Sequence, residues 1–475
     1  MSKKHHINRR NFLYQASCAS VGLTTLFSTV LNLKAVDAAA KLNLGPAMGP
    51  FDDYKAMVCL LLGGGADSYN MLIPTDNSDY QEYADARSNL AIPQGDIIPI
   101  NYSNNGKTFG IHPSMTNLAS AFNDGDAAFI ANVGSLIEPT DLAGIQNGTV
   151  QLPLGLYSHA DQVMHWQTAI PHDRVATGWG GKIADMLNAL DMPPNSNPDV
   201  PMSMSLSGSN VYQRGVSSSE FSVSPWWGVL EMNGYGDEWL SSQLRTTCVD
   251  NIIDAQYQDI FQATYINTVK SARDGSLQLK DALDNATPFQ TEFDQENYLS
   301  QAFQRIAEVI SARDTLGMKR QIFFVEYGGW DHHDELLDSQ AALLSDVDNA
   351  LHSFKLAMEE INMQNQVTTF SISDFARTLI SNGNGTDHAW GGNAFIMGGA
   401  VNGGTVYGSY PQLALNGNLQ VGNGVLIPTT SADEYFAELA LWFNVPSSGL
   451  LDIFPNLGNF YSPTSGGNPI GFMNL

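Results

Sequence analysis

The stretch Ala56–Ser68, AMVCLLLGGGADS, decides the fold, because seven apolar residues run without interruption into three glycines and an acidic residue. A short apolar run without polar alternation predicts a β-strand that is covered on both faces. The run 127–133 has the same character, and the runs 321–327 and 367–373 also end in glycine or an acidic residue. The sequence therefore predicts four strands for the interior of one sheet.

An amphipathic helix is predicted between the last two of these strands. Its apolar residues are spaced by three and four positions, at Leu344, Val347, Leu351, Phe354 and Met358. A strand, a helix and a second strand in this order form a right-handed crossover, which makes the two strands parallel neighbours. We therefore expect an α/β fold with a mostly parallel central sheet flanked by helices.

Acidic residues and histidines gather directly after these strands, where open α/β sheets bind their ligands. A second Asp-His pair stands between glycines in the stretch 385–392. Carboxylate oxygens and imidazole nitrogens together suit a divalent metal ion. The candidate metal ligands are Asp67, Asp331, His333, Asp374, Asp387 and His388. For any one acid, the alternative is a solvated loop residue in a chain that has 48 acidic residues. For the histidines, His332 included, we favour a functional role.

Three residues are candidates for catalysis. Ser158 begins an apparent helix, where backbone N–H groups and the helix dipole favour an anion, but with Asp161 it is equally a capping box. Ser68 follows Asp67 directly and is a nucleophile or a turn residue. Arg377 follows a strand end, where its guanidinium either grips an oxyanion or forms a surface ion pair.

The composition excludes some classes of partner. The 475 residues contain 22 Lys and Arg against 48 Asp and Glu, for a net charge of −26. A chain this acidic is repelled by nucleic acid and by anionic lipid. Cys59, inside the first apolar run, is expected to be a buried thiol rather than half of a disulfide.

Residues 1–40 are predicted to be an export signal. Arg9 and Arg10 precede Phe12 and Leu13, as in twin-arginine signals, and a moderately apolar stretch leads to a cut after Ala40. The alternative is a membrane anchor. The remainder, 41–475, is predicted to be one domain, with an irregular insertion at about 195–300 and a C-terminal cap.

Four motifs in order, at 61–70, 329–333, 373–378 and 385–391, resemble those of the domain-of-unknown-function family 1501. The resemblance runs from about Tyr54 to the C-terminus. Members of that family are usually bacterial proteins exported by the twin-arginine route. The family is placed in the alkaline phosphatase and sulfatase superfamily, which implies an alkaline phosphatase/sulfatase-like fold for this chain.

The resemblance also implies roles for residues. The superfamily pattern assigns metal ligation to Asp67, Asp331, His333, Asp374 and His388. It makes Ser158 the best match to the nucleophile. Phe375 stands where the superfamily has a histidine, which implies a single-metal site or a degenerate one, with Asp387 as a replacement ligand.

The sequence and the resemblance together predict an exported, periplasmic or secreted, metal-dependent hydrolase of phosphate or sulfate esters. One or two divalent ions (Zn, Ca, Mn or Mg) would activate Ser158, and Arg377 would steady a small anionic ester. The twin-arginine translocase would be a partner, and nucleic acid would not. The alternatives are a non-catalytic exported binding or assembly protein on the same fold, and a phosphomutase or transferase on the same fold.

Overall fold

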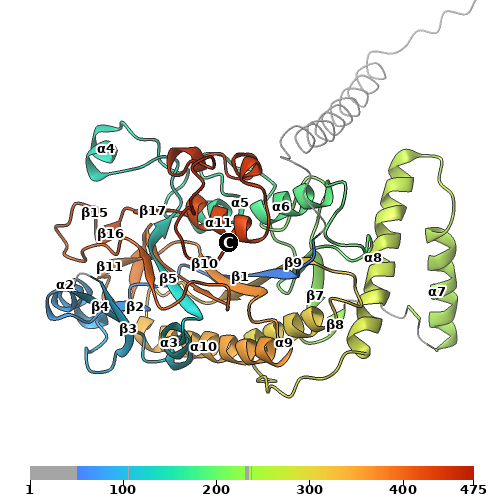
Figure 1. The fold of residues 1–475 in the computed structure, drawn as a ribbon, viewed down its shortest axis with the longest axis horizontal. Helices are drawn as coiled ribbons and strands as arrows, with labels where there is room; N and C mark the ends of the chain where they lie inside the picture. Colours follow the sequence, from blue (N-terminus) through green and yellow to red (C-terminus); the bar gives the residue numbers. More distant parts are fainter. Residues whose placement is uncertain (1–50, 105, 230–234, 237) are drawn as a thin grey trace, which may run out of the picture.

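A computed structural model describes residues 51–475 except 105, 230–234 and 237, so the predicted signal and its cut after Ala40 lie outside the described residues. A large mixed sheet runs through the molecule between two layers of helices (Figure 1). Its strands are β1 (Lys55–Gly63), β5 (Ala127–Gly134), β6 (Ser203–Ser205), β7 (Phe221–Ser224), β8 (Gly228–Val229), β9 (Arg320–Gly328), β10 (Val367–Ser373), β13 (Gly392–Met397), β14 (Val406–Gly408) and β17 (Thr430–Ser431). The expected α/β fold, with a mostly parallel sheet flanked by helices, is confirmed.

The strand predicted from the opening stretch, β1, lies at the centre of the sheet. It pairs in parallel with β10 on one side and with β9 on the other. The prediction that β9 and β10 are neighbours is wrong, because β1 separates them, although they are parallel as expected. The helix between them, α10 (Leu336–Glu360), contains the predicted 344–358 repeat. The register pairs Leu62 with Ser373 and Gly63 with Gly328, so the three strands end side by side.

The sheet departs from parallel order beside β10. There β13 runs antiparallel both to β10 and to β5, whereas β14 and β17 are parallel to β5. The run 127–133 therefore forms the predicted strand and is buried along its whole length, but its neighbours have both orientations. Apolar and polar residues do not alternate in this run because the strand is buried on both faces, whichever way its neighbours run.

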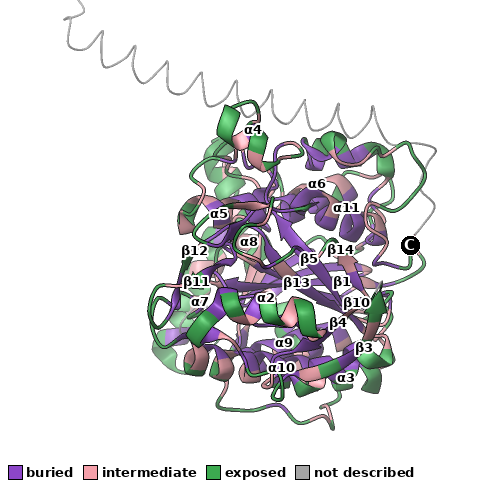
Figure 2. Cartoon of the chain, turned by 90° about the vertical axis from the view of Figure 1, so that its left-hand side faces the viewer, coloured by how far each residue is buried: buried purple, intermediate pink, exposed green. Residues whose placement is uncertain are grey.

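The core lies on both faces of the sheet. Along β1, Met57, Cys59 and Leu61 face one cluster of buried residues, and Val58, Leu60 and Leu62 face the other. Cys59 is fully buried, as expected. Helices α5 (His159–Thr168), α6 (Trp179–Asn188) and α11 (Ala432–Trp442) cover one face, and α3 (Thr116–Asp124), α9 (Tyr298–Ser311) and α10 cover the other. Figure 2 shows the buried sheet between these layers and the exposed residues outside them.

Shorter elements surround the sheet. They are the strands β2 (Leu72–Pro74), β3 (Ile98–Asn104), β4 (Lys107–Ile111), β11 (Arg377–Ser381), β12 (Thr386–His388), β15 (Gln420–Gly422) and β16 (Val425–Leu426), and the helices α2 (Asn77–Arg87), α4 (Leu142–Asn147) and α12 (Leu450–Ile453). In the region predicted to be an insertion, β6, β7 and β8 extend one edge of the sheet. They are followed by a helical hairpin, α7 (Leu240–Ile253) and α8 (Ile260–Asp284), at one end of the molecule (Figure 1). Within the described residues, no helix is both long enough and apolar enough to cross a bilayer.

Candidate metal centre

The loop after β9 carries Asp331 to the end of β1. The Trp330 N–H donates to the Gly63 carbonyl at 3.2 Å, so the loop continues the contact between the two strands. Gly64 has a φ of +120°, and a Cβ at this position would lie 2.6 Å from the Asp331 nitrogen. Only glycine combines this backbone conformation with so close an approach. The glycine run therefore brings the Asp331 backbone against the end of β1.

Arg377 fixes the Asp331 carboxylate. The guanidinium is fully buried, and its Nε donates to the Gly65 carbonyl at 2.7 Å and its Nη1 to the Thr386 carbonyl at 3.1 Å. Its Nη2 contacts Asp331 Oδ1 directly. Burial acts to raise the pKa of Asp331, but the hydrogen bond and charge of Arg377, with smaller contributions from His333 and His159, lower it below its ordinary value. Asp331 is therefore an anion at neutral pH.

This arrangement differs from the role expected of Arg377. All three guanidinium nitrogens have partners within the protein, so the group holds Asp331 and the loop rather than offering a free fork to a substrate oxyanion.

His159, the first residue of α5, is oriented by Asp374. Its Nδ1 lies 2.8 Å from Asp374 Oδ2, and the other carboxylate oxygen accepts from the Gly64 N–H at 3.0 Å. The His159 Nε2 consequently faces Asp331 Oδ1 at 3.6 Å. A carboxylate behind a histidine is the usual way in which proteins orient a metal-binding imidazole.

His388, at the end of β12, is oriented in a similar way by a carbonyl. Its Nδ1 lies 2.7 Å from the Tyr157 carbonyl oxygen, and its Nε2 lies 3.5 Å from Asp331 Oδ1. Because a carbonyl only accepts, Nδ1 carries the proton and the neutral ring presents a bare Nε2. Burial lowers the pKa of His388, although the hydrogen bond to Tyr157 opposes this, so the ring is neutral at pH 7.

His333 completes the group from the loop after β9. Its Nε2 is 3.1 Å from Asp331 Oδ1 and 3.0 Å from the Nε2 of His388, and its Nδ1 is 3.3 Å from Asp387 Oδ1. Each of the three histidines thus turns Nδ1 to an oxygen and Nε2 to Asp331. When Nδ1 carries the proton, each Nε2 has a free lone pair that is directed toward the Asp331 carboxylate. A cation bound between these atoms would stabilise this arrangement.

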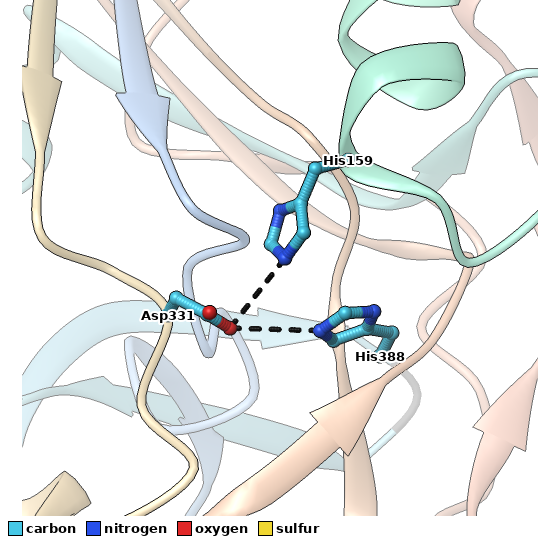
Figure 3. A group of neighbouring side chains, drawn as sticks. All are labelled: His159, Asp331 and His388. Carbon is cyan, nitrogen blue, oxygen red and sulfur yellow. Dashed lines mark ion pairs between the residues drawn. The ribbon is translucent and has the colours of Figure 1, made fainter.

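The donor atoms fit one divalent metal ion. Among the described residues, one ligand atom each from His159, Asp331 and His388 lies within 4.8 Å of the others (Figure 3). Two or three imidazole nitrogens with one carboxylate oxygen are typical ligands of Zn²⁺ and of other first-row transition metals, whereas Ca²⁺ and Mg²⁺ prefer oxygen ligands. The histidine-rich set therefore favours a transition metal.

The structure brings together some of the predicted ligands and separates others. Asp331, His333 and His388 meet in one group, while Asp374 and Asp387 stand behind histidines that point into it. Asp67 is fully buried and forms an ion pair with Arg87, outside the group. His332 is also buried, and neither of its ring nitrogens has a hydrogen-bond partner among the described residues.

His159 was not predicted as a ligand. Its only sequence signal is its place directly after Ser158 at the start of a helix that follows a central strand.

Ser158 is the N-cap of α5, and its hydroxyl accepts from the Asp161 N–H at 3.5 Å, so its capping role is confirmed. It stands between Tyr157, whose carbonyl oxygen contacts His388, and His159, which is itself a member of the candidate metal-ligand group. Ser68 is almost completely buried, and its hydroxyl accepts from the Asn393 N–H at 2.8 Å. The Ser68 hydroxyl therefore connects the turn after β1 to β13. Of the two serines, Ser158 is the one directly next to a candidate ligand, His159.

Phe375 packs against the ligand rings. Its ring centroid is 4.5 Å from that of His388, in a stacked arrangement, and 4.8 Å from that of His159. The side chain is buried. An aromatic ring thus fills the space beside His159 and His388.

An open cavity of about 520 Å³ adjoins the group. The side chains on its wall include His333, His388, Tyr157, Thr378 and Asp387, and the hairpin of β15 and β16 forms the opposite side with Val421, Gly422, Asn423 and Val425. Two of the candidate ligand rings thus face a space large enough for a small molecule.

Comparison with known proteins gives weak structural similarities and one family. The crystal structure of Ps i-CgsB aligns with a TM-score of 0.33 and 10% identity, over 87% of this chain and 78% of that chain. The lipoteichoic acid synthase LtaP from Listeria monocytogenes aligns with a TM-score of 0.30 and 8% identity, over 83% and 79%. A mutant of the alkaline phosphatase PafA aligns with a TM-score of 0.23 and 10% identity, over 70% and 64%. No curated protein matches the sequence.

All of these TM-scores are 0.33 or lower. The sequence itself matches a family model over residues 54–423, and that model is described as "Protein of unknown function (DUF1501)". Since the match covers well over half of the chain, and since the four motifs already resemble that family, the chain belongs to the DUF1501 family.

Proposed function

We propose that this chain is a metal-dependent hydrolase of phosphate or sulfate esters, with one transition-metal ion held by His159, Asp331 and His388 and with His333 as a fourth ligand. One observation carries the proposal. Three imidazole Nε2 atoms face Asp331 Oδ1, at 3.6, 3.1 and 3.5 Å. This arrangement leaves an excess of lone pairs, which a bound cation would neutralise.

When bound, the metal would polarise an ester oxygen and lower the pKa of a coordinated hydroxyl or water. The residues of the chain supply the rest. Arg377 keeps Asp331 ionised and in place. Asp374 and the Tyr157 carbonyl hold the rings of His159 and His388 with Nε2 inward. Phe375 fills the neighbouring space, which supports a site for a single ion.

Ser158 is the nucleophile in this proposal. Its neighbours on both sides contact the ligand group, so the backbone of residues 157–159 is fixed beside the metal position. It also lies at the N-terminus of a ten-residue helix, where the helix dipole stabilises negative charge on an alkoxide or an ester. A small anionic ester would enter from the open cavity on the side of His333 and His388.

Export is part of the proposal and rests on the sequence alone. The paired arginines at Arg9 and Arg10 and the small residues before the cut support transport by the twin-arginine translocase to the periplasm or the outside.

The test combines metal analysis with an ester panel. Purified protein should contain one equivalent of a transition metal and should hydrolyse an aryl phosphate or an aryl sulfate. His159→Ala and His388→Ala should lose the metal and the activity, whereas His352→Ala, which removes an exposed histidine on α10, should keep both. Absence of stoichiometric metal from the wild type after reconstitution would overturn the metal site.

Turnover by the wild type separates a second candidate function from the first, and Ser158→Ala then tests the nucleophile. The engagement of the Ser158 hydroxyl in the helix cap favours a non-catalytic, metal-containing binding protein. If the metal is bound and no ester is turned over by the wild type, that second function stands. If turnover is present and survives Ser158→Ala, a metal-bound water replaces serine as the nucleophile.

A further inference from the structure

The hairpin of α7 and α8 leaves a large apolar surface exposed. Helix α8 packs against the body through β8 and α9, and its residues Leu279 and Ala282 are buried there. Helix α7 packs on α8, on the side away from the body (Figure 1). The outer helix is thus presented to solvent at one end of the molecule.

The side chains on this surface are large and apolar or aromatic, although they are exposed to water. They are Trp239, Leu240, Leu244, Ile252, Ile260, Phe261 and Tyr265, and each is between 54% and 77% exposed. On α7, Leu240, Leu244, Cys248 and Ile252 follow one another at intervals of four, and all four are exposed. Residues at this spacing form a stripe along one side of a helix.

The polar contacts within the hairpin come from other residues than this stripe. Between the helices, Arg273 pairs with Asp250 at 2.9 Å and Lys270 pairs with Asp254 at 2.9 Å. The Tyr235 hydroxyl donates to the same Asp250 at 2.6 Å. Two ion pairs therefore join the helices, while Leu240, Leu244 and Ile252 stay exposed on α7.

The exposed area is sufficient for a stable dimer. With about 150–250 Å² for each aromatic side chain and somewhat less for each aliphatic one, the exposed fractions amount to roughly 800 Å² per copy. Specific interfaces bury about 800 Å² per partner. The surface is therefore large enough for an interface.

The charge of the hairpin favours a second copy of the chain over a membrane. Residues 239–284 contain four basic and six acidic residues, a net charge of −2 out of −26 for the whole chain. Helices that lie on anionic membranes carry a strongly basic polar face, which these lack. Two copies repel each other over most of their surface, and the nearly neutral hairpin is where they meet at the lowest electrostatic cost.

We propose that the hairpin is a self-association surface, on which two copies pack their α7–α8 hairpins together as a four-helix bundle. Such an interface is isologous, so each α7 stripe faces its equivalent across a twofold axis. Cys248 lies near the middle of α7, and antiparallel pairing of the two α7 helices brings the two Cys248 thiols close together.

The experiment is sedimentation equilibrium of the full chain over a range of concentrations. The wild type is expected to be a dimer at micromolar concentration. Leu244→Glu buries two charges in the interface and should raise the dimer Kd at least a hundredfold. Leu451→Glu is the matched control, because Leu451 is a similarly exposed leucine on α12 and should leave the Kd unchanged. Circular dichroism and metal content should be the same in all three proteins.

Crosslinking gives a second readout that does not depend on stability. In a Cys18→Ser background, a short bismaleimide should link two chains through Cys248, because Cys59 is buried, and Cys248→Ser should abolish the product. A wild type that stays monomeric at 100 μM, or a Leu244→Glu variant that dimerises as tightly as the wild type, overturns the proposal. Binding of a monomeric wild type to phosphatidylcholine vesicles would overturn it in favour of a lipid surface.

Discussion

The carboxylate of Asp374 tests the metal centre most sharply, because it is not a proposed ligand itself and holds the ring of the proposed ligand His159. Its two oxygens accept from His159 Nδ1 and from the Gly64 N–H, at 2.8 and 3.0 Å. In Asp374→Asn one oxygen becomes an NH₂ group. That group faces an N–H donor whichever way the amide is turned, so at least one of the two hydrogen bonds is lost.

The loss of one hydrogen bond sets the expected decrease in metal affinity. A hydrogen bond to a charged acceptor contributes about 1.5–3 kcal/mol, and residues that orient metal-binding histidines change metal affinity by about 10- to 100-fold. Asp374→Asn should therefore weaken Zn²⁺ binding by 10- to 100-fold, equal to about 1.4–2.7 kcal/mol. Competition with a chromophoric chelator at pH 7.5 measures this directly.

Asp334→Asn is the control for loss of a nearby negative charge. Asp334 lies three positions after Asp331, and its carboxylate accepts from the Asn384 side chain and from the Glu335 N–H, neither of which belongs to a proposed ligand. Its variant should bind Zn²⁺ within about threefold of the wild type, since exposed charges in water interact weakly. If Asp374→Asn, folded by circular dichroism, keeps the wild-type affinity within that range, the orientation of His159 by Asp374 is not what makes the site.

Further predictions concern stability and pH. Arg377→Met leaves the buried Gly65 and Thr386 carbonyls without their donor, and urea unfolding of the metal-free protein should show a loss of about 2–6 kcal/mol, at about 1–3 kcal/mol for each buried group left unpaired. Gly64→Ala places a Cβ 2.6 Å from the Asp331 nitrogen at a φ of +120°, so it should weaken metal binding at least tenfold, whereas Gly95→Ala, which has open space, should not. Burial lowers the pKa of both His112 and His165 to about 4. The unfolded chain therefore binds more protons than the folded chain between pH 6.5 and pH 4. The free energy of unfolding should accordingly decrease as the pH is lowered through that window, by up to about 3 kcal/mol per histidine. His112→Gln should flatten this fall, and an unchanged pH dependence would contradict the assignment. Chelation of the metal should lower the melting temperature, because about 4 kcal/mol of binding free energy is lost when the metal was present at a thousand times its Kd.

The ends of the strands were the predictable part of both the fold and the site. Apolar runs that stop at glycine or aspartate located β1, β9 and β10 within a residue or two, and their shared ends brought Asp331 close to the residues around Asp374. The order of strands was not predictable in the same way. The crossover rule fixes direction and hand but not how many strands are passed over, and α10 passes over β1.

Partner choice was the unpredictable part of the site. Asp67 and Asp331 have similar local sequences, each near glycines after a buried strand, yet Arg87 neutralises Asp67 while Arg377 positions Asp331. Both pairings depend on tertiary contacts that local patterns do not contain. His159 was missed for a related reason, because an imidazole at the start of a helix has no spacing relation to the other ligands until α5 lies against β10.

The wide separation of the ligands in the chain gives the bound ion a mechanical effect. The Tyr157 carbonyl and His388, which the centre joins, are 231 positions apart in the sequence. An ion held by His159, Asp331 and His388 therefore links segments that are far apart in the sequence. Because the ion binds only when these segments are together, its binding free energy opposes their separation. Proteolytic nicking of the segment between β11 and β12 should accordingly accelerate when the ion is withdrawn, long before the rest of the sheet gives way.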